Sequence, residues 1–136
     1  MNLLDEREYY KPFIYPWAFE KYKRQQQMHW LPDEVPLQDD IKDYNQKLTE
    51  DERRLIDNIF KFFTQADVDV CCGYAKHYLP TFKQPEVRMM LVSFAAMEAV
   101  HQEAYSLLLE TLGKSDDMYS EFFDIQAMSE KHDYLT

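Results

Sequence analysis

Two long stretches of the chain repeat apolar residues at intervals of three and four positions, the spacing of a helix with one buried face. They cover residues 50–78 and 85–113. Thr49 and Glu52 form a capping-box pattern at the start of the first, Pro85 opens the second, and Gly113 follows its last apolar residues. The pattern therefore predicts two long helices with defined ends.

Polar residues interrupt both apolar faces. At about 100° per residue, Glu98, His101 and Tyr105 project from one side of the second helix over two turns. Asp67 falls on the centre of the apolar face of the first helix. An ionised carboxylate among apolar neighbours costs several kcal/mol unless a metal or a cationic group compensates it. If the helices pack antiparallel through these faces, the four side chains share one interior, which predicts a functional site.

The residues before the first long helix differ in character. Residues 1–48 are rich in proline, aspartate and aromatic residues, with a helical period only over about residues 18–28. Pro32 and Pro36 predict an extended path, with Trp30 as an apolar anchor. We expect an N-terminal arm over 1–48 and a helical body over 49–136, which includes a cap at 115–117 and the start of a third helix. Because this last pattern is still running at Thr136, we expect further protein to follow, on this polypeptide or on a partner chain.

The composition favours an all-α protein, because only two of the 136 residues are glycine. A net charge of −10, from 15 basic and 25 acidic residues, disfavours binding to nucleic acid or to an anionic membrane. The chain has no apolar run of membrane-spanning length and no basic region of a secretory signal at its start. We therefore expect a cytoplasmic protein in which the adjacent Cys71 and Cys72 are small buried residues and form no disulfide.

Glu98 and His101 offer a carboxylate oxygen and an imidazole nitrogen to one point, a donor set that suits iron, manganese or zinc. Helical bundles that bind two metals use a carboxylate from each of two helices and a Glu-x-x-His pair from each of two others. With Asp67, this chain has half of such a set and no second pair. Asp69 lies about 200° around the helix from the apolar face. The remaining histidines lack partners at suitable spacing and are expected at the surface: His29, His77 and His132.

In this order and spacing the residues resemble the small, radical-generating subunit of class I ribonucleotide reductase. The resemblance runs from about Tyr15 to the end of the chain and implies a ferritin-like helical bundle, here incomplete, made of the arm, two long helices and the start of a third. The matching passages are Tyr15-Pro16-Trp17-Ala18, Gln27-Met28-His29-Trp30-Leu31-Pro32-Asp33-Glu34-Val35-Pro36-Leu37, Asp67 ahead of Glu98, and Met97-Glu98-Ala99-Val100-His101-Gln102-Glu103-Ala104-Tyr105-Ser106.

The resemblance also implies roles for individual residues. Asp67, Glu98 and His101 would be ligands of a dinuclear metal centre of two iron ions, with manganese or a mixed pair as alternatives, and Glu98 would bridge the metals. Tyr105 would be oxidised to a tyrosyl radical when the reduced centre activates oxygen, and Trp30 would relay an electron to the centre along a route that includes His101. The radical would then pass to a separate large subunit that reduces ribonucleotides to deoxyribonucleotides.

A complete small subunit of this family is much longer and contributes the remaining ligands. The chain is therefore expected to be an N-terminal half that acts with a C-terminal half, a second small subunit and the large subunit. Two alternatives remain open: a related dimetal-carboxylate ligand-binding oxidase in which Tyr105 is structural or cross-linked, and a non-catalytic helical binding or assembly module with a defunct or empty site. Trp30 together with Tyr105 favours the reductase, because an oxidase needs no electron relay from the surface.

Overall fold

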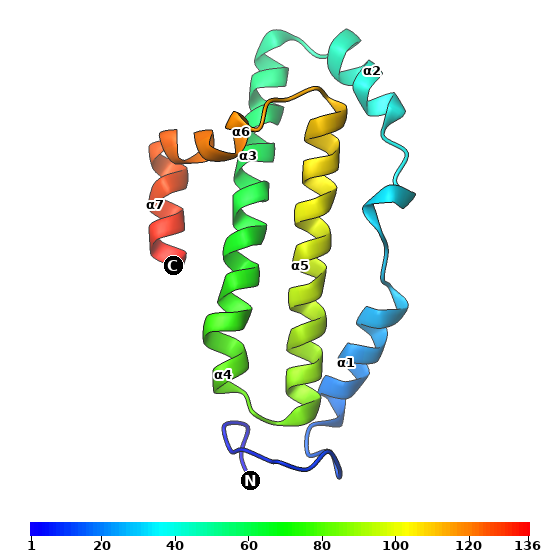
Figure 1. Ribbon diagram of the computed structural model, residues 1–136, viewed down its shortest axis with the longest axis vertical. Coiled ribbons are helices and arrows are strands. Elements are labelled where there is room, and N and C mark those ends of the chain that lie inside the picture. The colour runs from blue at the N-terminus through cyan, green and yellow to red at the C-terminus, as the bar shows by residue number, and fades with distance from the viewer.

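The computed structural model describes all of residues 1–136 and contains helices and connecting loops without strands. This confirms the expected all-α class. Two long helices lie antiparallel and side by side in the centre, with the N-terminal arm along one flank and the C-terminal helices along the other (Figure 1). In chain order the elements are α1 (Pro16–Gln27), η1 (Pro32–Glu34), α2 (Gln38–Gln46), α3 (Glu50–Gly73), η2 (Tyr74–Tyr78), α4 (Leu79–Thr81), α5 (Pro85–Thr111), α6 (Asp117–Ser120), η3 (Glu121–Asp124) and α7 (Gln126–Leu135).

The two central helices, α3 and α5, begin and end close to the predicted residues. The Thr49 hydroxyl accepts from the Glu52 amide at 3.2 Å and the Glu52 carboxylate accepts from the Thr49 amide at 2.8 Å, so the capping box is confirmed. Pro85 is the first residue of α5, and Gly113 lies just beyond its end with a φ of 74°, a conformation that glycine adopts at little cost. The local sequence therefore fixes the ends of both helices.

The chain continues past α3 in a way that the sequence analysis did not resolve. Residues Tyr74–Tyr78 form a π-helical turn, η2, which continues directly into the short α4. Such turns carry hydrogen bonds one residue longer than those of an α-helix and re-aim the side chains that follow. In this turn the rings of Tyr74 and Tyr78 lie 5.6 Å apart.

The start of the arm is fastened to the beginning of α5 by a buried ion pair. The Arg7 guanidinium donates to the Glu86 carboxylate, and both side chains are 0% exposed. Glu86 Oε1 also accepts from the backbone amides of Ile14 and Tyr15, at 2.9 and 3.0 Å. Next to it α1 packs on α5, with Ala18 completely buried. The arm is thus held by specific polar contacts as well as by apolar burial.

Two segments of the arm are more helical than expected. Residues Gln38–Gln46 form α2, and the passage between Pro32 and Pro36 contains the single 3₁₀ turn η1 instead of a continuous extended path. Asp39 and Asp40 occupy the first turn of α2, where their charge complements the helix dipole. A helix of nine residues gives too short a periodic pattern to stand out in a proline-rich stretch.

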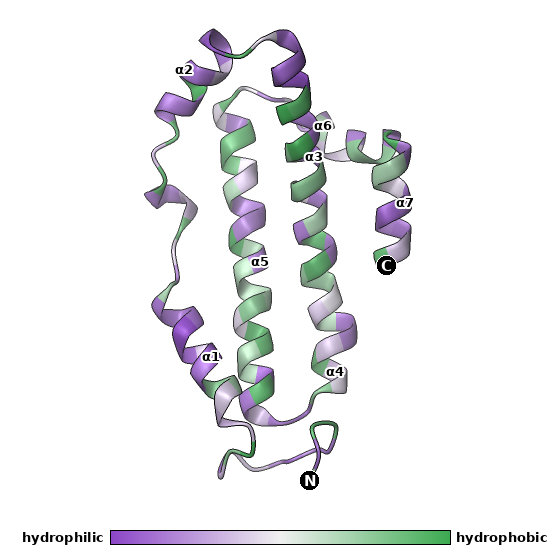
Figure 2. Cartoon of the chain, turned by 180° about the vertical axis from the view of Figure 1, so that it is seen from behind, coloured by the Kyte–Doolittle hydropathy of each residue, from purple (hydrophilic) through white to green (hydrophobic).

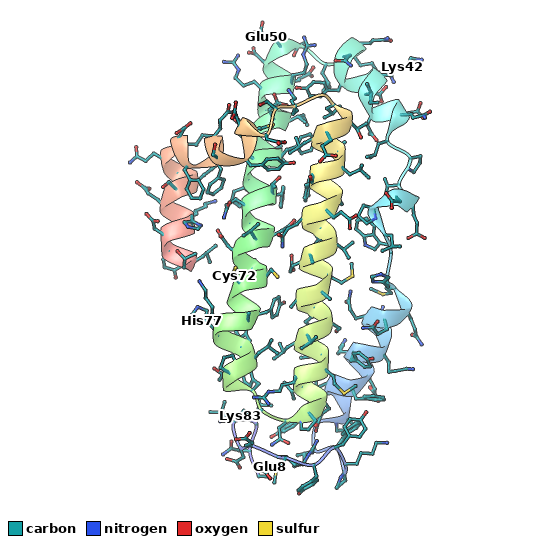
Figure 3. The ribbon with its side chains drawn as sticks, in the orientation of Figure 1. Glu8, Lys42, Glu50, Cys72, His77 and Lys83 are labelled. Atoms are coloured by element: carbon teal, nitrogen blue, oxygen red, sulfur yellow. The ribbon has the colours of Figure 1, made fainter.

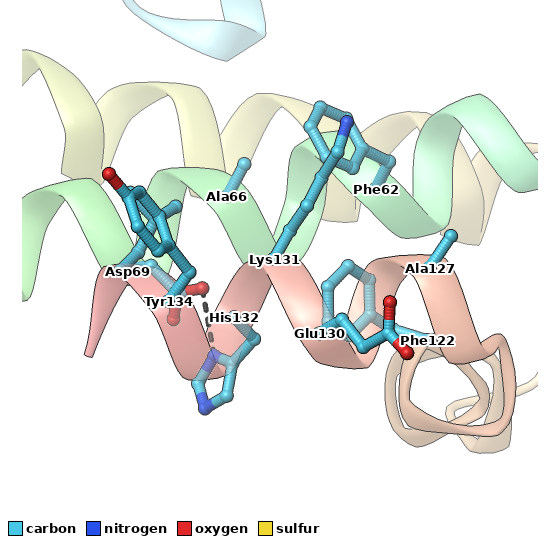
Figure 4. A pocket seen from close by; sticks show the side chains of 10 residues that line it. Phe62, Ala66, Asp69, Phe122, Ala127, Glu130, Lys131, His132 and Tyr134 are labelled. Atoms are coloured by element: carbon cyan, nitrogen blue, oxygen red, sulfur yellow. Dashed lines mark hydrogen bonds and ion pairs between the residues drawn. The ribbon is translucent and has the colours of Figure 1, made fainter.

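The C-terminal helices turn back along the outer side of α3 and make an unexpected contact there. His132 Nδ1 of α7 lies 2.8 Å from Asp69 Oδ2, and the exposed fractions of these side chains are 23% and 5% (Figure 4). The prediction that His132 is an ordinary surface residue was therefore wrong. The reason is tertiary, because α7 returns to the face of α3 opposite α5.

The outer side of α3 also carries side chains that stay in contact with solvent. Cys72 and His77 are exposed and lie on this outer side (Figure 3). Both cysteines are free, as expected, and Cys71 is half-buried with its sulfur 3.8 Å from the Ala95 carbonyl. The expectation that both are buried was wrong for Cys72, which points to the uncovered side of the helix.

The helical body is open. Only 14 of the 136 residues are buried, and the accessible surface of 9055 Å² exceeds the roughly 7,500 Å² typical of a folded monomer of this mass. The hydrophobic residues concentrate on α3 and α5, whereas α1 and α2 are mainly hydrophilic (Figure 2). Apolar side chains of α3 that would sit inside a closed bundle, such as Phe63 and Val70, are each 40% exposed. The architecture is therefore an incomplete helical bundle.

Candidate metal centre

The central helices bring together three of the predicted site residues. Asp67 comes from α3, and Glu98 and His101 come from successive turns of α5. One ligand atom from each of them lies within 4.8 Å of the other two, and no second cluster of this kind occurs among the 136 residues. His101 Nδ1 is 3.3 Å from Glu98 Oε2. The spacing of Glu98 and His101 on one helix and the antiparallel approach of α3 together create this cluster.

The Asp67 carboxylate is the member of the cluster whose charge is least well compensated. Its Oδ2 atom is buried and has no hydrogen-bond partner. Burial, and next the charge of Glu98, raise the pKa of Asp67 to about 6, while His101 acts in the opposite direction. Above that pH two carboxylates face one another with insufficient positive charge nearby. A cation at this point would supply the missing partner for the orphaned oxygen.

The donor set fits a transition metal. Two carboxylates and an imidazole are ligands that iron, manganese and zinc share, and hard oxygen donors favour the first two when they predominate. Three ligands are fewer than the two-carboxylate, two-pair set that holds two metals in helical bundles. Asp67, Glu98 and His101 are therefore a set that could hold a metal ion, but a smaller set than two metals require.

The cluster is partly open to solvent. The Glu98 side chain is 18% exposed and that of His101 is 38% exposed. Both border a pocket of about 520 Å³. This open side agrees with the expected incomplete bundle, because the two helices cover only one side of the cluster. The pocket is lined by Trp30, Phe63, Ala66, Asp67, Val70, Glu98, His101, Ala104 and Tyr105.

Tyr105 lies one to two turns beyond the cluster on α5 and against aromatic rings of α3. Its ring is stacked on Phe63, with centroids 5.8 Å apart and planes 6° from parallel, and Phe60 lies 6.2 Å away. Burial, followed by the negative charge of Asp67, raises the pKa of Tyr105 above its ordinary value. The phenol is therefore held neutral beside the carboxylates, on a half-dry face of the helix pair.

Trp30 reaches the cluster from the arm. Its ring centroid is 6.3 Å from that of His101, with the planes inclined by 32°. The half-buried indole forms one wall of the pocket. All five residues singled out in the sequence therefore line the same pocket, although their chemical roles remain predictions.

The sequence analysis assigned no role to Tyr74, which the structure places near the cluster. Burial, followed by the negative charge of Glu98, raises the pKa of this phenol. Tyr74, the first residue of η2, follows Asp67 by seven residues, as Tyr105 follows Glu98 by seven on α5. That repeated spacing is the signal that could have pointed to it.

Comparison with known proteins gives a consistent result. Residues 7–136 match the family described as "Ribonucleotide reductase, small chain". The chain is 50% identical over 135 residues to a probable ribonucleoside-diphosphate reductase small subunit of invertebrate iridescent virus 6. The matched residues make up 99% of this chain and 38% of that protein. It is 33% identical over 113 residues to the ribonucleoside-diphosphate reductase small subunit of Dictyostelium discoideum, covering 83% of this chain and 33% of the relative.

Solved structures share the fold. The ribonucleotide reductase R2 subunit from Clostridium botulinum superposes with a TM-score of 0.79 at 25% identity, covering 88% of this chain and 38% of that one. The ribonucleotide reductase Rnr4 homodimer from Saccharomyces cerevisiae gives a TM-score of 0.84 at 21% identity, and the match covers 98% of this chain and 44% of that one. The chain thus spans less than half the length of these relatives. None of its helices is both long enough and apolar enough to span a membrane.

Proposed function

Because the chain belongs to the ribonucleotide reductase small-chain family, we propose that it supplies one side of a dinuclear metal centre and the tyrosine that this centre oxidises. The observation that carries the proposal is the convergence of Asp67, Glu98 and His101, together with the buried Asp67 Oδ2, which has no hydrogen-bond partner within the chain. Two iron ions are the proposed occupants, with manganese or a mixed pair as alternatives. The ferritin-like arrangement of α3 and α5 agrees with this assignment.

In the proposed mechanism each residue has a separate task. The bound metals, with oxygen, supply the oxidising power. Asp67, Glu98 and His101 hold the ions between α3 and α5. Tyr105 would give one electron to the oxidised centre and its phenolic proton to a basic oxygen there, and the resulting tyrosyl radical would be shielded from water in part by the stacked ring of Phe63. Trp30 lies against His101 and passes an electron inward from the surface.

The remaining parts of the proposal concern partners. The open side of the pocket would be covered by helices that contribute the other ligands, carried by a polypeptide equivalent to the rest of the viral relative. A second small subunit and a large catalytic subunit, which performs ribonucleotide reduction, complete the proposed assembly. We place this assembly in the cytoplasm, where two free cysteines remain reduced.

Metal binding by the chain itself provides the first test. We expect cobalt(II), measured by visible absorption and calorimetry, to bind one site, and Glu98→Gln or His101→Ala to weaken it at least tenfold. Asp69→Asn is the matched control, because Asp69 lies on the same helix as Asp67 but pairs with His132 on its other side. Equal affinities in the wild type and the Glu98 and His101 variants would refute the ligand roles.

The radical requires the completed centre. The chain is co-expressed with the portion of the viral relative that it does not match, then mixed with iron(II) and oxygen and examined by electron paramagnetic resonance. We expect a tyrosyl signal that disappears in Tyr105→Phe, while Trp30→Phe keeps the metal content but slows electron delivery from an external reductant. A signal that persists in Tyr105→Phe would assign the radical elsewhere.

A further inference from the structure

A polar cluster at the far end of the helix pair joins three parts of the chain. Tyr44 of α2 donates its hydroxyl hydrogen to Asp57 Oδ1 of α3 at 2.7 Å. Lys114, just after α5, donates to Asp57 Oδ2 at 2.8 Å and to the Tyr44 hydroxyl at 2.5 Å. The Lys114 ammonium also lies 4.7 Å from the centre of the Tyr44 ring. We call this group the Tyr44–Asp57–Lys114 clasp.

The clasp is sheltered enough to be stable. Tyr44 is 9% exposed, and the side chains of Lys114 and Asp57 are 23% and 24% exposed. Burial raises the pKa of Tyr44, so its phenol stays protonated at neutral pH. Burial alone lowers the pKa of Lys114, but its bonds to Asp57 and Tyr44 outweigh this and raise it. A neutral phenol and a charged ammonium are the forms that these three hydrogen bonds require.

The segment between α1 and the clasp has few other attachments. Every hydrogen bond made by residues 28–43 stays within residues 24–47, so none reaches α3 or α5. Pro32 is the single buried residue of the segment. Trp30 lies in its first part, close to the end of α1, and Tyr44 follows directly after its last residue. Apolar packing adds one attachment in its middle, where η1 lies on α5 with Pro32 buried. The segment is therefore a strap held by α1, by η1 and, at its far end, by the hydrogen bonds of the clasp.

We propose that the Tyr44–Asp57–Lys114 clasp is a positioning device that keeps this strap closed over α5 and thereby holds Trp30 against His101. Opening the clasp would leave the strap attached only through α1 and the packing of η1 on α5, so the segment would gain conformations and the indole would leave the imidazole for part of the time. This inference rests on the relay role proposed for Trp30. In this proposal Tyr44, Asp57 and Lys114 control the distance between the rings of Trp30 and His101, which the electron must cross.

Tryptophan fluorescence tests the proposal on the chain alone. A Trp17→Phe background leaves Trp30 as the single tryptophan. In that background Tyr44→Phe removes both hydrogen bonds that α2 makes to Asp57 and Lys114, whereas Lys114→Met removes the two bonds of Lys114 and keeps the one between Tyr44 and Asp57. Both are compared with Lys114→Arg, which keeps a donor and a charge. Lys47→Met is the matched control, because it removes an exposed ion pair with Asp43 that lies within α2 and does not reach the body.

Acrylamide quenching of tryptophan fluorescence measures the solvent accessibility of the Trp30 indole. We expect the quenching constant to rise at least twofold in Tyr44→Phe and by less in Lys114→Met, with unchanged helical circular dichroism, and to stay near the starting value in Lys114→Arg and Lys47→Met. If Lys114→Met loses helicity, the quenching of Tyr44→Phe alone tests the proposal, because this variant removes only one oxygen atom. Quenching that is unchanged in Tyr44→Phe, or that rises equally in Lys47→Met, would overturn the proposal.

The measurement needs neither metal nor a partner. A failed cobalt(II) test with normal quenching behaviour would refute the metal centre and leave the clasp, and the reverse result would refute the clasp alone. The two proposals are therefore distinguishable.

Discussion

Replacing Glu86 by glutamine should release the N-terminal arm. In the wild type, the Arg7 guanidinium and the Glu86 carboxylate are both shielded completely from water and satisfy one another. Glu86→Gln keeps the size and an acceptor oxygen for the amides of Ile14 and Tyr15 but leaves a buried positive charge without its partner. Breaking a buried pair from one side costs about 3–5 kcal/mol, unless the remaining charge escapes to solvent.

The Arg7 guanidinium can reach solvent only if the arm detaches from α5. Hydrogen exchange at the Ile14 and Tyr15 amides measures how often this happens. When exchange follows the population of the open state, about 3 kcal/mol corresponds to roughly a hundredfold faster exchange. Glu6→Gln is the control, because it breaks the exposed pair between Glu6 and Lys83 in the same region. The double variant Arg7→Met with Glu86→Gln should recover part of the protection, since no charge is then left buried.

The same carboxylate gives the arm a defined pH dependence. Burial by itself raises the pKa of Glu86, but the Tyr15 amide, the other backbone donors and the Arg7 guanidinium outweigh it and lower the pKa. A lowered folded-state pKa stabilises the docked arm above the ordinary value of 4.5, and this contribution is lost as the pH falls through the folded-state pKa. Exchange rates that match between Glu86→Gln and Glu6→Gln, or an arm that stays equally protected in acid, would refute the reasoning.

Three further changes have defined outcomes. Thr49→Ala removes the cap of α3 and should lower the free energy of unfolding by about 1 kcal/mol in urea titrations; an unchanged midpoint would contradict the role of the cap. Asp67→Asn should stabilise the metal-free chain at about pH 8 but not at about pH 3, because the penalty for ionising Asp67 is complete above its folded-state pKa of about 6 and absent below the ordinary 3.8; stabilisation that is equal at both values would argue against it. His132→Ala should speed amide exchange in α7 by removing the bond to Asp69, whereas exposed His77→Ala should leave it unchanged.

The candidate site shows how far sequence reasoning extends. The helical period alone put Glu98, His101 and Tyr105 on one face, and the structure agrees, with His101 3.3 Å from Glu98. The period could also select Asp67 over Asp69, which indeed points to the other side of α3. The period alone could not say how exposed each of these side chains is, because exposure depends on which elements cover the face.

The nine-residue α2 and the π-helical turn η2 were missed for a related reason. In short segments the tertiary contacts decide between several conformations of similar local energy.

The sequence by itself determined the elements whose signals lie within one turn of each other. Thr49 and Glu52 are three residues apart, and Gly113 lies two residues past the last residue of α5, so backbone geometry and local hydrogen bonds suffice. Only the tertiary structure decided the pairs that are far apart in sequence. Arg7 and Glu86 are separated by 79 positions, and Tyr44 and Lys114 by 70. Nothing local marks such partners, because their free energy arises from burial that exists only once α1, α2, α3 and α5 have met.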